Sequence, residues 1–493
     1  MPEGGDSSLL RATGFDPLQG PPDEEGGRPP RPVGFGQALR FWFRLGWVSF
    51  GGPAGQIALL HAELVERRRW ISEGRFLHAL NYCMLLPGPE AQQLATYLGW
   101  LLHRTVGGVV AGALFVLPSL VILVALSALY VAFGEVPLVA GLFYGIKPAV
   151  TALVVQAAHR IGTRTLRNGA LWGLAAAAFV AVFALGLPFP LVVVAAALLG
   201  FVGARVAPQR FGGATGHGPA HGPGHAARAA HPPALIDDDT PAPAHARFNP
   251  LALARVLVAG FALWALPMVL LAAWQGERGL LPQMGWFFTQ AALLTFGGAY
   301  AVLPFVHQGA VLQHGWVSAP QMMDGLALGE STPGPLIMVV AFVAFVGGWQ
   351  SPELAVQLAG LGDAAPYAAG AIAAVVVTWF TFLPSFIFIL AGGPLVESTR
   401  GNLAFTGPLT AITAAVCGVI VNLALFFAAH VLWPRGLAGG VLAGLDLAAL
   451  LIGLAAGYAL IVRRRGVIEV LAASAVVGAL VFLGLPASWR GGA

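Results

Sequence analysis

Long apolar segments make up most of this chain, and short polar or basic loops separate them. A bilayer is crossed by about 20 apolar residues in a helix. Uninterrupted segments of about that length cover residues 106–133, 138–158, 170–187, 189–206, 251–274, 365–391, 403–430, 441–462 and 467–485. Four further apolar segments, residues 35–60, 76–103, 287–312 and 322–348, are broken near their middle by glycine or proline. The pattern predicts an all-α polytopic membrane protein with broken helices.

The broken segments occur twice in one register. A shift of about 246 residues places the FGG of residues 50–52 on that of residues 296–298, and the PGP of residues 87–89 on that of residues 333–335. A second register of about 266 residues aligns the LPS of residues 117–119 with that of residues 383–385. Such repeats determine the fold. We therefore predict five parts: a disordered segment (1–33), a first copy (34–206), a linker (207–249), a connecting transmembrane helix (250–276) and a second copy (277–490).

The distribution of arginine predicts that the two copies face opposite sides of the membrane. The loop before Trp70 reads RRRW, whereas the equivalent loop before Trp316 reads QHGW and has no Lys or Arg. Basic loops stay in the cytoplasm, so the first loop and the N-terminus are expected inside and the second loop outside. Arginines flank both ends of the first two broken segments, which favours re-entrant hairpins, although full crossings remain open. An inverted repeat with broken helices is a transporter architecture.

Composition supports the membrane assignment and excludes several other classes. The chain has 57% hydrophobic and only 10% charged residues, with a net charge of +4, whereas soluble domains carry about 25% charged residues. The charge lies mostly in loops, so it indicates topology and not nucleic-acid binding. The two cysteines give neither a disulfide framework nor a metal site. Motifs of hydrolases, metalloproteases and P-loop NTPases are absent, so we expect neither an enzyme nor a cofactor.

The backbone breaks are the candidate binding site. Irregular backbone at membrane depth survives where protein or water covers it, and a helix that starts after a break offers free N–H groups and a positive end to a small anion. In the first copy the candidates are Phe50, Gly51, Gly52, Pro53, Gln56, Asn81, Pro87, Gly88, Pro89 and Gln92. In the second they are Phe296, Gly297, Gly298, Ser331, Thr332, Pro333, Gly334 and Pro335. Alternatively, these residues kink helices or form helix–helix hydrogen bonds.

Three charged residues stand out within the apolar segments. Lys147 lies inside residues 138–158 with no acidic residue within a turn; a charge in a span marks a functional site by default, and snorkelling to the interface is the alternative. Glu90 and Glu330 flank the PGP motifs. Either is a candidate proton carrier or a candidate acidic partner of Lys147. Four histidines in the linker have metal-like spacing: His217, His221, His225 and His231. Their Gly/Pro/Ala-rich surroundings favour a low-complexity linker over a metal site.

With these motifs the chain resembles the chromate transporter family in its long two-domain form. The resemblance rests on FGGPAGQIALLHAELVERRRWIS, PGPEAQQLATYLGW and a second FGGAYAVLP with STPGPLIMVVAFV, and it covers residues 35–206 and 280–485. It implies chromate efflux through the bacterial inner membrane, resistance to chromate, and sulfate as the related oxyanion. It also implies that the FGG and PGP motifs are functional. Ala299 stands where the first copy has Pro53, so the two sites need not be equivalent.

The electrical driving force favours export. One charge moved across 100 mV corresponds to ~2.3 kcal/mol, so a dianion leaving a negative-inside cell gains ~4.6 kcal/mol, enough for a gradient of roughly a thousandfold. A proton-coupled sulfate importer and an oxyanion channel are the alternatives. The expected partners are chromate, with sulfate as an option, and the lipid bilayer. The sequence leaves the oligomeric state open, with a homodimer among the options.

Overall fold

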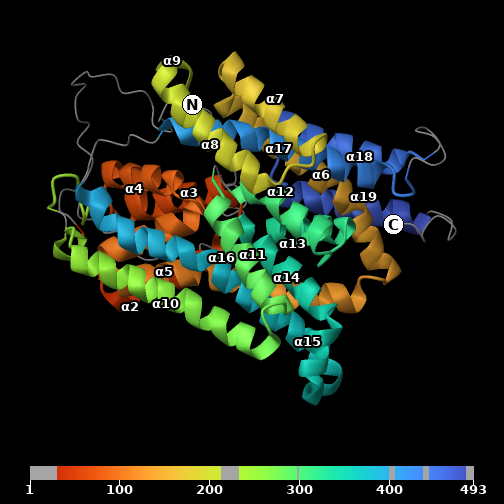
Figure 1. Cartoon of the computed structure of the whole chain (residues 1–493), viewed down its shortest axis with the longest axis horizontal. Coiled ribbons are helices and arrows are strands. Elements are labelled where there is room, and N and C mark those ends of the chain that lie inside the picture. The colour runs from red at the N-terminus through yellow and green to blue at the C-terminus, as the bar shows by residue number, and fades with distance from the viewer. Residues whose placement is uncertain are drawn as a thin grey trace.

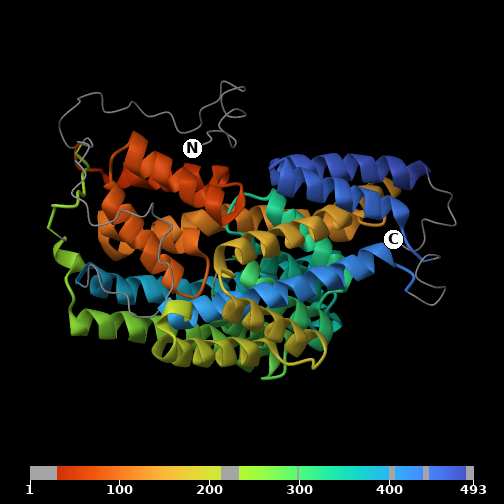
Figure 2. The ribbon, with the colours of Figure 1, turned by 90° about the horizontal axis from the view of Figure 1, so that it is seen from above.

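The structure is a computed structural model that describes residues 30–211, 233–241, 243–296, 299–398, 406–436 and 444–484. The described residues form α-, 3-10 and π-helices joined by short loops. Their only β-pairing is one isolated parallel bridge between Ile71 and Ile236. Figures 1 and 2 show the helices in two perpendicular views. The predicted all-α fold is therefore confirmed.

The first half of the chain contains the breaks at the predicted places. Its helices are α2 (Phe35–Val48), α3 (Gly52–His61), the π-helix η1 (Ala62–Arg67), α4 (Glu73–Leu85), α5 (Glu90–Phe133), α6 (Pro137–Thr165), α7 (Gly169–Phe183), α8 (Phe189–Val206) and α9 (Pro208–Phe211). Helix α5 joins two predicted segments, and its backbone leaves helical geometry at His103 and Arg104. The chain therefore bends sharply where the sequence predicts a loop.

The second half begins after a short 3-10 turn, η2 (Ala244–Ala246), with the connecting helix α10 (Pro250–Gln275). Its broken segments comprise α11 (Leu280–Leu294), η3 (Ala299–Val302), α12 (Leu303–Val306), the π-helix η4 (His307–Gln313), α13 (Ala319–Ser331), η5 (Leu336–Met338) and α14 (Val339–Trp349). The remaining helices are α15 (Pro352–Gln357), η6 (Ala359–Ala364), α16 (Ala365–Ser398), α17 (Thr406–Leu432), α18 (Leu447–Gly457), η7 (Tyr458–Val462) and α19 (Val467–Gly484).

The described helices have the length and surface of a multi-pass membrane protein. Seven are long and apolar enough to cross a bilayer, and three shorter apolar helices accompany them. Helix α10 is covered least, because only 6% of its most apolar window is buried. Large side chains such as Val258 and Phe261 are more than 60% exposed on it. A contiguous apolar surface of this kind is stable against lipid and not against water.

Local structure repeats in the register of the sequence repeat. Helices α4 and α13 occupy equivalent positions, and each begins with a serine, Ser72 or Ser318, whose hydroxyl accepts a hydrogen bond from a backbone N–H of the first turn. The π-helices η1 and η4 precede them at equivalent places. Trp70 and Trp316 then donate equivalent backbone bonds of 2.8 Å to the π-helices. The local backbone structure is thus the same at equivalent positions of the two copies, although most of the side chains there differ.

The two copies interleave instead of packing as separate bodies. Helix α6 of the first copy packs against α17, α18 and α19 of the second, and α5 packs against α14 and α16. The blue helices α17–α19 accordingly lie among the golden helices α6–α8 in Figures 1 and 2. This interleaving brings the breaks of both copies to the middle of the same helix bundle.

Candidate functional site

The breaks of the two copies contact each other through a pair of equivalent hydrogen bonds. The N–H of Gly88 donates to the carbonyl of Thr295 at 2.8 Å, and the N–H of Gly334 donates to the carbonyl of Ser49 at 2.8 Å. Ser49 and Thr295 are equivalent under the repeat shift, and so are Gly88 and Gly334. Each PGP motif is therefore bonded to the end of α2 or α11 in the other copy.

Both PGP glycines are required by backbone conformation and by space. Gly88 and Gly334 have φ of +120° and +110°, a region that side chains disfavour. A Cβ on Gly88 would lie 2.5 Å from the hydroxyl oxygen of Ser385, and one on Gly334 would lie 2.7 Å from the Cβ of Ser119. Ser119 and Ser385 belong to the two equivalent LPS motifs. The repeated PGP and LPS motifs thus form a second pair of contacts between the copies.

The first break also provides a helix N-terminus that has no side-chain cap. Gly51 and Gly52 have φ of +91° and +67°, and α3 begins at Gly52 with no side-chain hydrogen bond to its first N–H groups. Helix α5 likewise begins after Pro89 without a side-chain cap. Uncapped N-termini leave backbone donors for another partner. An anion is the ligand that such helix ends favour.

Three buried glutamines surround the breaks of the first copy. The amide nitrogen of Gln56 donates to the carbonyls of both Ser49 and Gly334. That of Gln93 donates to the carbonyl of Pro87 at 2.7 Å, and that of Gln92 donates to the hydroxyl of Thr96 at 3.1 Å. The equivalent residues of the second copy are Val302, Val339 and Met338. The two copies therefore share a backbone arrangement but differ in polarity.

Two carboxylates at the breaks lie in the field of an arginine. Glu330 accepts a hydrogen bond of 2.6 Å from the hydroxyl of Tyr300. Arg160, near the end of α6, acts electrostatically on both Glu90 and Glu330, and its guanidinium lies 5.7 Å from the centre of the Tyr300 ring. Arg164 adds a further positive charge acting on Glu90. Arg160 lies just beyond the predicted apolar segment of residues 138–158, and the sequence did not indicate it as a site residue.

Lys147 belongs to a different charged cluster. It is half-buried on α6, and its charge acts on Asp324 of α13. Asp324 is 3% exposed and accepts a hydrogen bond of 2.9 Å from the hydroxyl of Tyr130. Arg160 lies thirteen positions after Lys147 on α6, which corresponds to about 20 Å along the helix. Asp324 was missed because its partners come from other helices.

The remaining candidates are spread over several environments. Asn81 and Ser331 are exposed, and Phe50 is 41% exposed. Thr332 is buried and donates to the carbonyl of Leu328. Buried or half-buried positions are occupied by Pro53, Pro87, Pro89, Phe296, Pro333 and Pro335. Outside the described residues lie Gly297, Gly298, His217, His221, His225 and His231. Within the described part of the chain, no group of three or more metal-binding side chains occurs.

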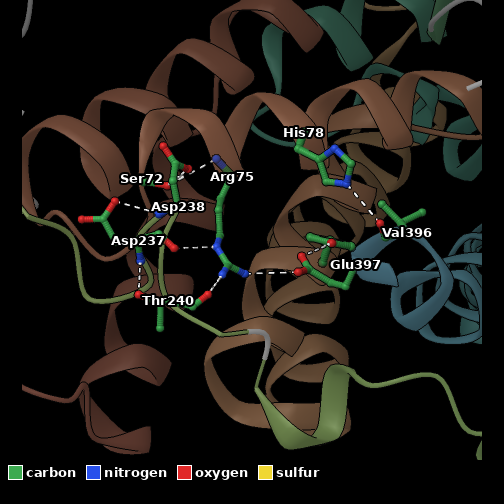
Figure 3. A network of polar contacts seen from close by, with 9 residues as sticks. Ser72, Arg75, His78, Asp237, Asp238, Thr240, Val396 and Glu397 are labelled. Atoms are coloured by element: carbon green, nitrogen blue, oxygen red, sulfur yellow. Dashed lines mark hydrogen bonds and ion pairs between the residues drawn. The ribbon is translucent and has the colours of Figure 1, made fainter. Parts of the chain in front are cut away.

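Part of the predicted linker is docked on the first copy. Residues 233–241 run beside the start of α4, where Ile236 pairs with Ile71. Arg75 of α4 donates to the backbone carbonyls of Asp237 and Thr240 and forms an ion pair of 3.1 Å with Glu397 of α16. Figure 3 shows this arginine between the linker and α16. Arg75 therefore joins the linker and both copies, which the sequence alone did not indicate.

Seven apolar helices and paired backbone breaks define a polytopic membrane protein with broken helices of the transporter type. The sequence profile of the chromate transporter family matches residues 36–201 and 282–479. The chain belongs to the chromate transporter family.

Curated relatives agree with this assignment. The chain is 34% identical to the chromate transport protein of Pseudomonas aeruginosa, over 79% of this chain and 80% of the relative. It is 27% identical to the chromate transport protein of Cupriavidus metallidurans, over 80% and 82% of the two chains. A probable chromate transport protein of Synechococcus elongatus is 25% identical over 78% and 82%. No solved structure gives a significant match.

Proposed function

We propose that this protein exports chromate from the cytoplasm across the bacterial inner membrane and so confers chromate resistance. The relatives named as chromate transport proteins supply the substrate class. The observation that carries the site is the pair of equivalent bonds, Gly88 to Thr295 and Gly334 to Ser49, which joins the breaks of the two copies. The binding site then lies where these breaks meet.

In this proposal the oxyanion lies against the uncapped starts of α3 and α5. Backbone N–H groups after Gly51 and Pro89 donate to its oxygens, and the helix ends supply positive potential. Arg160 adds charge and offsets Glu90 and Glu330, whose own charges would otherwise repel an anion. The glycines permit a close approach of the backbone to the ligand.

The equivalent contacts also suggest how access alternates. We place the N-terminus in the cytoplasm and the two copies in opposite orientations, on the arginine pattern of the loops. Opening then breaks one of the two bonds, Gly88 to Thr295 or Gly334 to Ser49, while the other holds the opposite side closed. Alternating movement of one repeat against the other is the usual mechanism for repeat-built transporters.

Transport into inside-out membrane vesicles tests the function and its direction. An anion leaving a negative-inside cell gains ~2.3 kcal/mol per charge per 100 mV. Vesicles whose lumen is made positive should therefore accumulate labelled chromate, and cells that express the protein should tolerate more chromate than cells without it. Accumulation equal to that of vesicles lacking the protein would contradict the proposal. The variant Gly52→Val tests the site, because α3 starts at this glycine with φ of +67°.

A further inference from the structure

Three buried amide oxygens at the breaks accept no hydrogen bond from any described residue. Gln56, Gln92 and Gln93 are at most 1% exposed, and the Oε1 atom of each has no donor within the described part of the protein. Each amide nitrogen already donates to a carbonyl or hydroxyl. Flipping the amide of Gln56 or Gln93 would place its oxygen against a backbone carbonyl, which has no proton to donate. In these two residues the orientation is therefore fixed and the oxygen remains an acceptor.

Unpaired buried acceptors indicate that the site needs a hydrogen-bond donor. Buried polar groups in proteins are nearly always hydrogen-bonded. A group left without a partner lowers the equilibrium constant of folding or binding by about tenfold to a hundredfold. The neighbouring carboxylates of Glu90 and Glu330 are further acceptors, and Tyr300 supplies a donor to Glu330. A bare tetrahedral dianion carries acceptors only, so it satisfies the helix N–H groups but none of these oxygens.

An oxyanion that keeps one proton satisfies both sides of the site. Its charged oxygens accept from backbone N–H groups, and its hydroxyl donates to a buried oxygen. We infer, on the basis of the function proposed above, that the protein binds hydrogen chromate, the singly protonated anion, and that its O–H donates to Oε1 of Gln56. Gln56 is chosen because its amide contacts the breaks of both copies, at Ser49 and Gly334.

This assignment gives a physical basis for selection among oxyanions of equal shape. Chromate takes up a proton near neutral pH, whereas sulfate and selenate do so only in strong acid. A site built to pair a substrate hydroxyl rejects an analogue that lacks it, because its buried groups are then left unpaired. Chromate is therefore bound in preference to selenate and sulfate although all three are tetrahedral.

The assignment also changes the charge moved in each cycle. Hydrogen chromate carries one negative charge and one proton, and the proton remains on the substrate throughout. The electrical driving force is then half that of the dianion, which supports a gradient of a few tens-fold at about 100 mV. One proton accompanies each chromate to the far side and is released there when the medium is alkaline.

A competition experiment with the purified full-length protein tests the inference. Chromate binding is measured from mildly acidic to mildly alkaline pH, with selenate as the competitor that has the same shape and no proton. We expect chromate affinity to fall as the hydroxyl is lost with rising pH and to level off near that of selenate, which should bind about tenfold to a hundredfold more weakly than hydrogen chromate. Equal affinity for chromate and selenate, or a pH-independent chromate affinity, overturns the inference.

Selenate separates the effect of the substrate's own proton from the effect of protons bound to the protein. The titratable and charged groups around the breaks are Glu90 of α5, Glu330 of α13, Tyr300 of η3, and Arg160 and Arg164 of α6. Their titration would change the binding of chromate and selenate alike, whereas loss of the substrate's hydroxyl affects chromate alone. Selenate affinity measured over the same pH range is therefore the reference for each chromate value.

The substitution Gln56→Val places the residue of the second copy, Val302, in the first copy and removes the unpaired acceptor. Selenate should then bind within about threefold of chromate. Gln156→Leu, which removes an α6 amide that donates to the carbonyl of Leu460 in η7, should keep the wild-type preference. If Gln56→Val keeps the full preference, the assignment to Gln56 is wrong. If it does not fold, the wild-type comparison of chromate with selenate decides. Absence of any chromate binding or transport would instead refute the proposed function itself.

Discussion

Arg75 and Glu397 form the buried contact through which the linker and the two copies hold together, and removing one partner should destabilise the protein. Both side chains are 3% exposed, and their nitrogen and oxygen lie 3.1 Å apart. Glu397 also accepts a hydrogen bond of 2.7 Å from the hydroxyl of Tyr97. Arg75→Met removes the Arg75 guanidinium from this buried carboxylate, and it removes the donor to the carbonyls of Asp237 and Thr240.

The size of the effect follows from the cost of breaking a buried ion pair. Breaking one side of a buried ion pair costs about 3–5 kcal/mol. At about 2 cal/mol/K of unfolding entropy per residue, a chain of this length loses about 3–5 °C in melting temperature if it melts as one unit. Arg465→Met is the matched control, because its pair with Glu469 is more than half exposed at both side chains. Exposed pairs contribute about 0–1 kcal/mol.

Thermal unfolding of the detergent-purified protein, together with limited proteolysis near residues 233–241, measures both consequences. Arg75→Met should lower the melting temperature and expose the docked segment to cleavage, whereas Arg465→Met should do neither. The double variant Arg75→Met with Glu397→Met should be more stable than either single variant, because both buried charges of the pair are then removed. Strictly additive losses of melting temperature in the double variant, or an Arg75→Met variant as stable as the Arg465→Met control, would refute the stabilising role of the Arg75–Glu397 pair.

Three further predictions concern the breaks, the second charged cluster and pH. Gly88→Ala and Gly334→Ala should each abolish chromate transport in vesicles, since a Cβ would approach Ser385 or Ser119 within 2.7 Å at a positive φ; Gly173→Ala, which meets nothing within 4 Å, should transport normally. Lys147→Gln should reduce transport at least about tenfold. The double variant Lys147→Gln with Asp324→Asn should lose less transport, because the second change removes the buried charge that Lys147 offsets. Equal losses in the single and the double variant would count against an interaction between Lys147 and Asp324. Burial lowers the pKa of His245 from 6.5, so the folded protein binds fewer protons there than the unfolded chain, and melting temperature should fall as pH drops below about 6.5. His245→Gln should weaken this dependence, and an unchanged profile would exclude His245 as its source.

The sequence predicts the helices and the breaks because both depend on local chemistry. Apolar runs of the right length determine helices such as α8, whose bounds Phe189–Val206 coincide with the prediction. Gly88 and Gly334 are visible as motifs because a left-handed backbone requires glycine. The repeat register then shows that the two breaks are equivalent, without showing what each one contacts.

The partners of the charged residues could not be predicted, because they come from helices distant in sequence. Arg75 pairs with Glu397 across more than 300 positions. Asp324 lies among apolar residues in the sequence, and Lys147 and Tyr130 reach it from α6 and α5. Arg160 follows the predicted apolar segment of residues 138–158, yet its charge acts on Glu90 and Glu330. Such contacts depend on how helices of the two copies pack against each other, which the periodicity of the sequence does not show.

At the breaks the two copies are alike in backbone geometry and differ in several buried side chains, and this difference has a functional consequence. The hydrogen bonds from Gly88 and Gly334 repeat, but Gln56 is matched by Val302 and Arg160 by Phe426 in the second copy. Symmetric backbone contacts suit two gates that open in turn, since each needs the same movement. Asymmetric side chains suit one binding site, because only the first copy contributes the amide acceptors and the cation to the place where the breaks of both copies meet. We therefore expect one oxyanion bound per chain, and a measured stoichiometry of two would require the apolar second copy to bind an anion without a polar side chain at either of these positions.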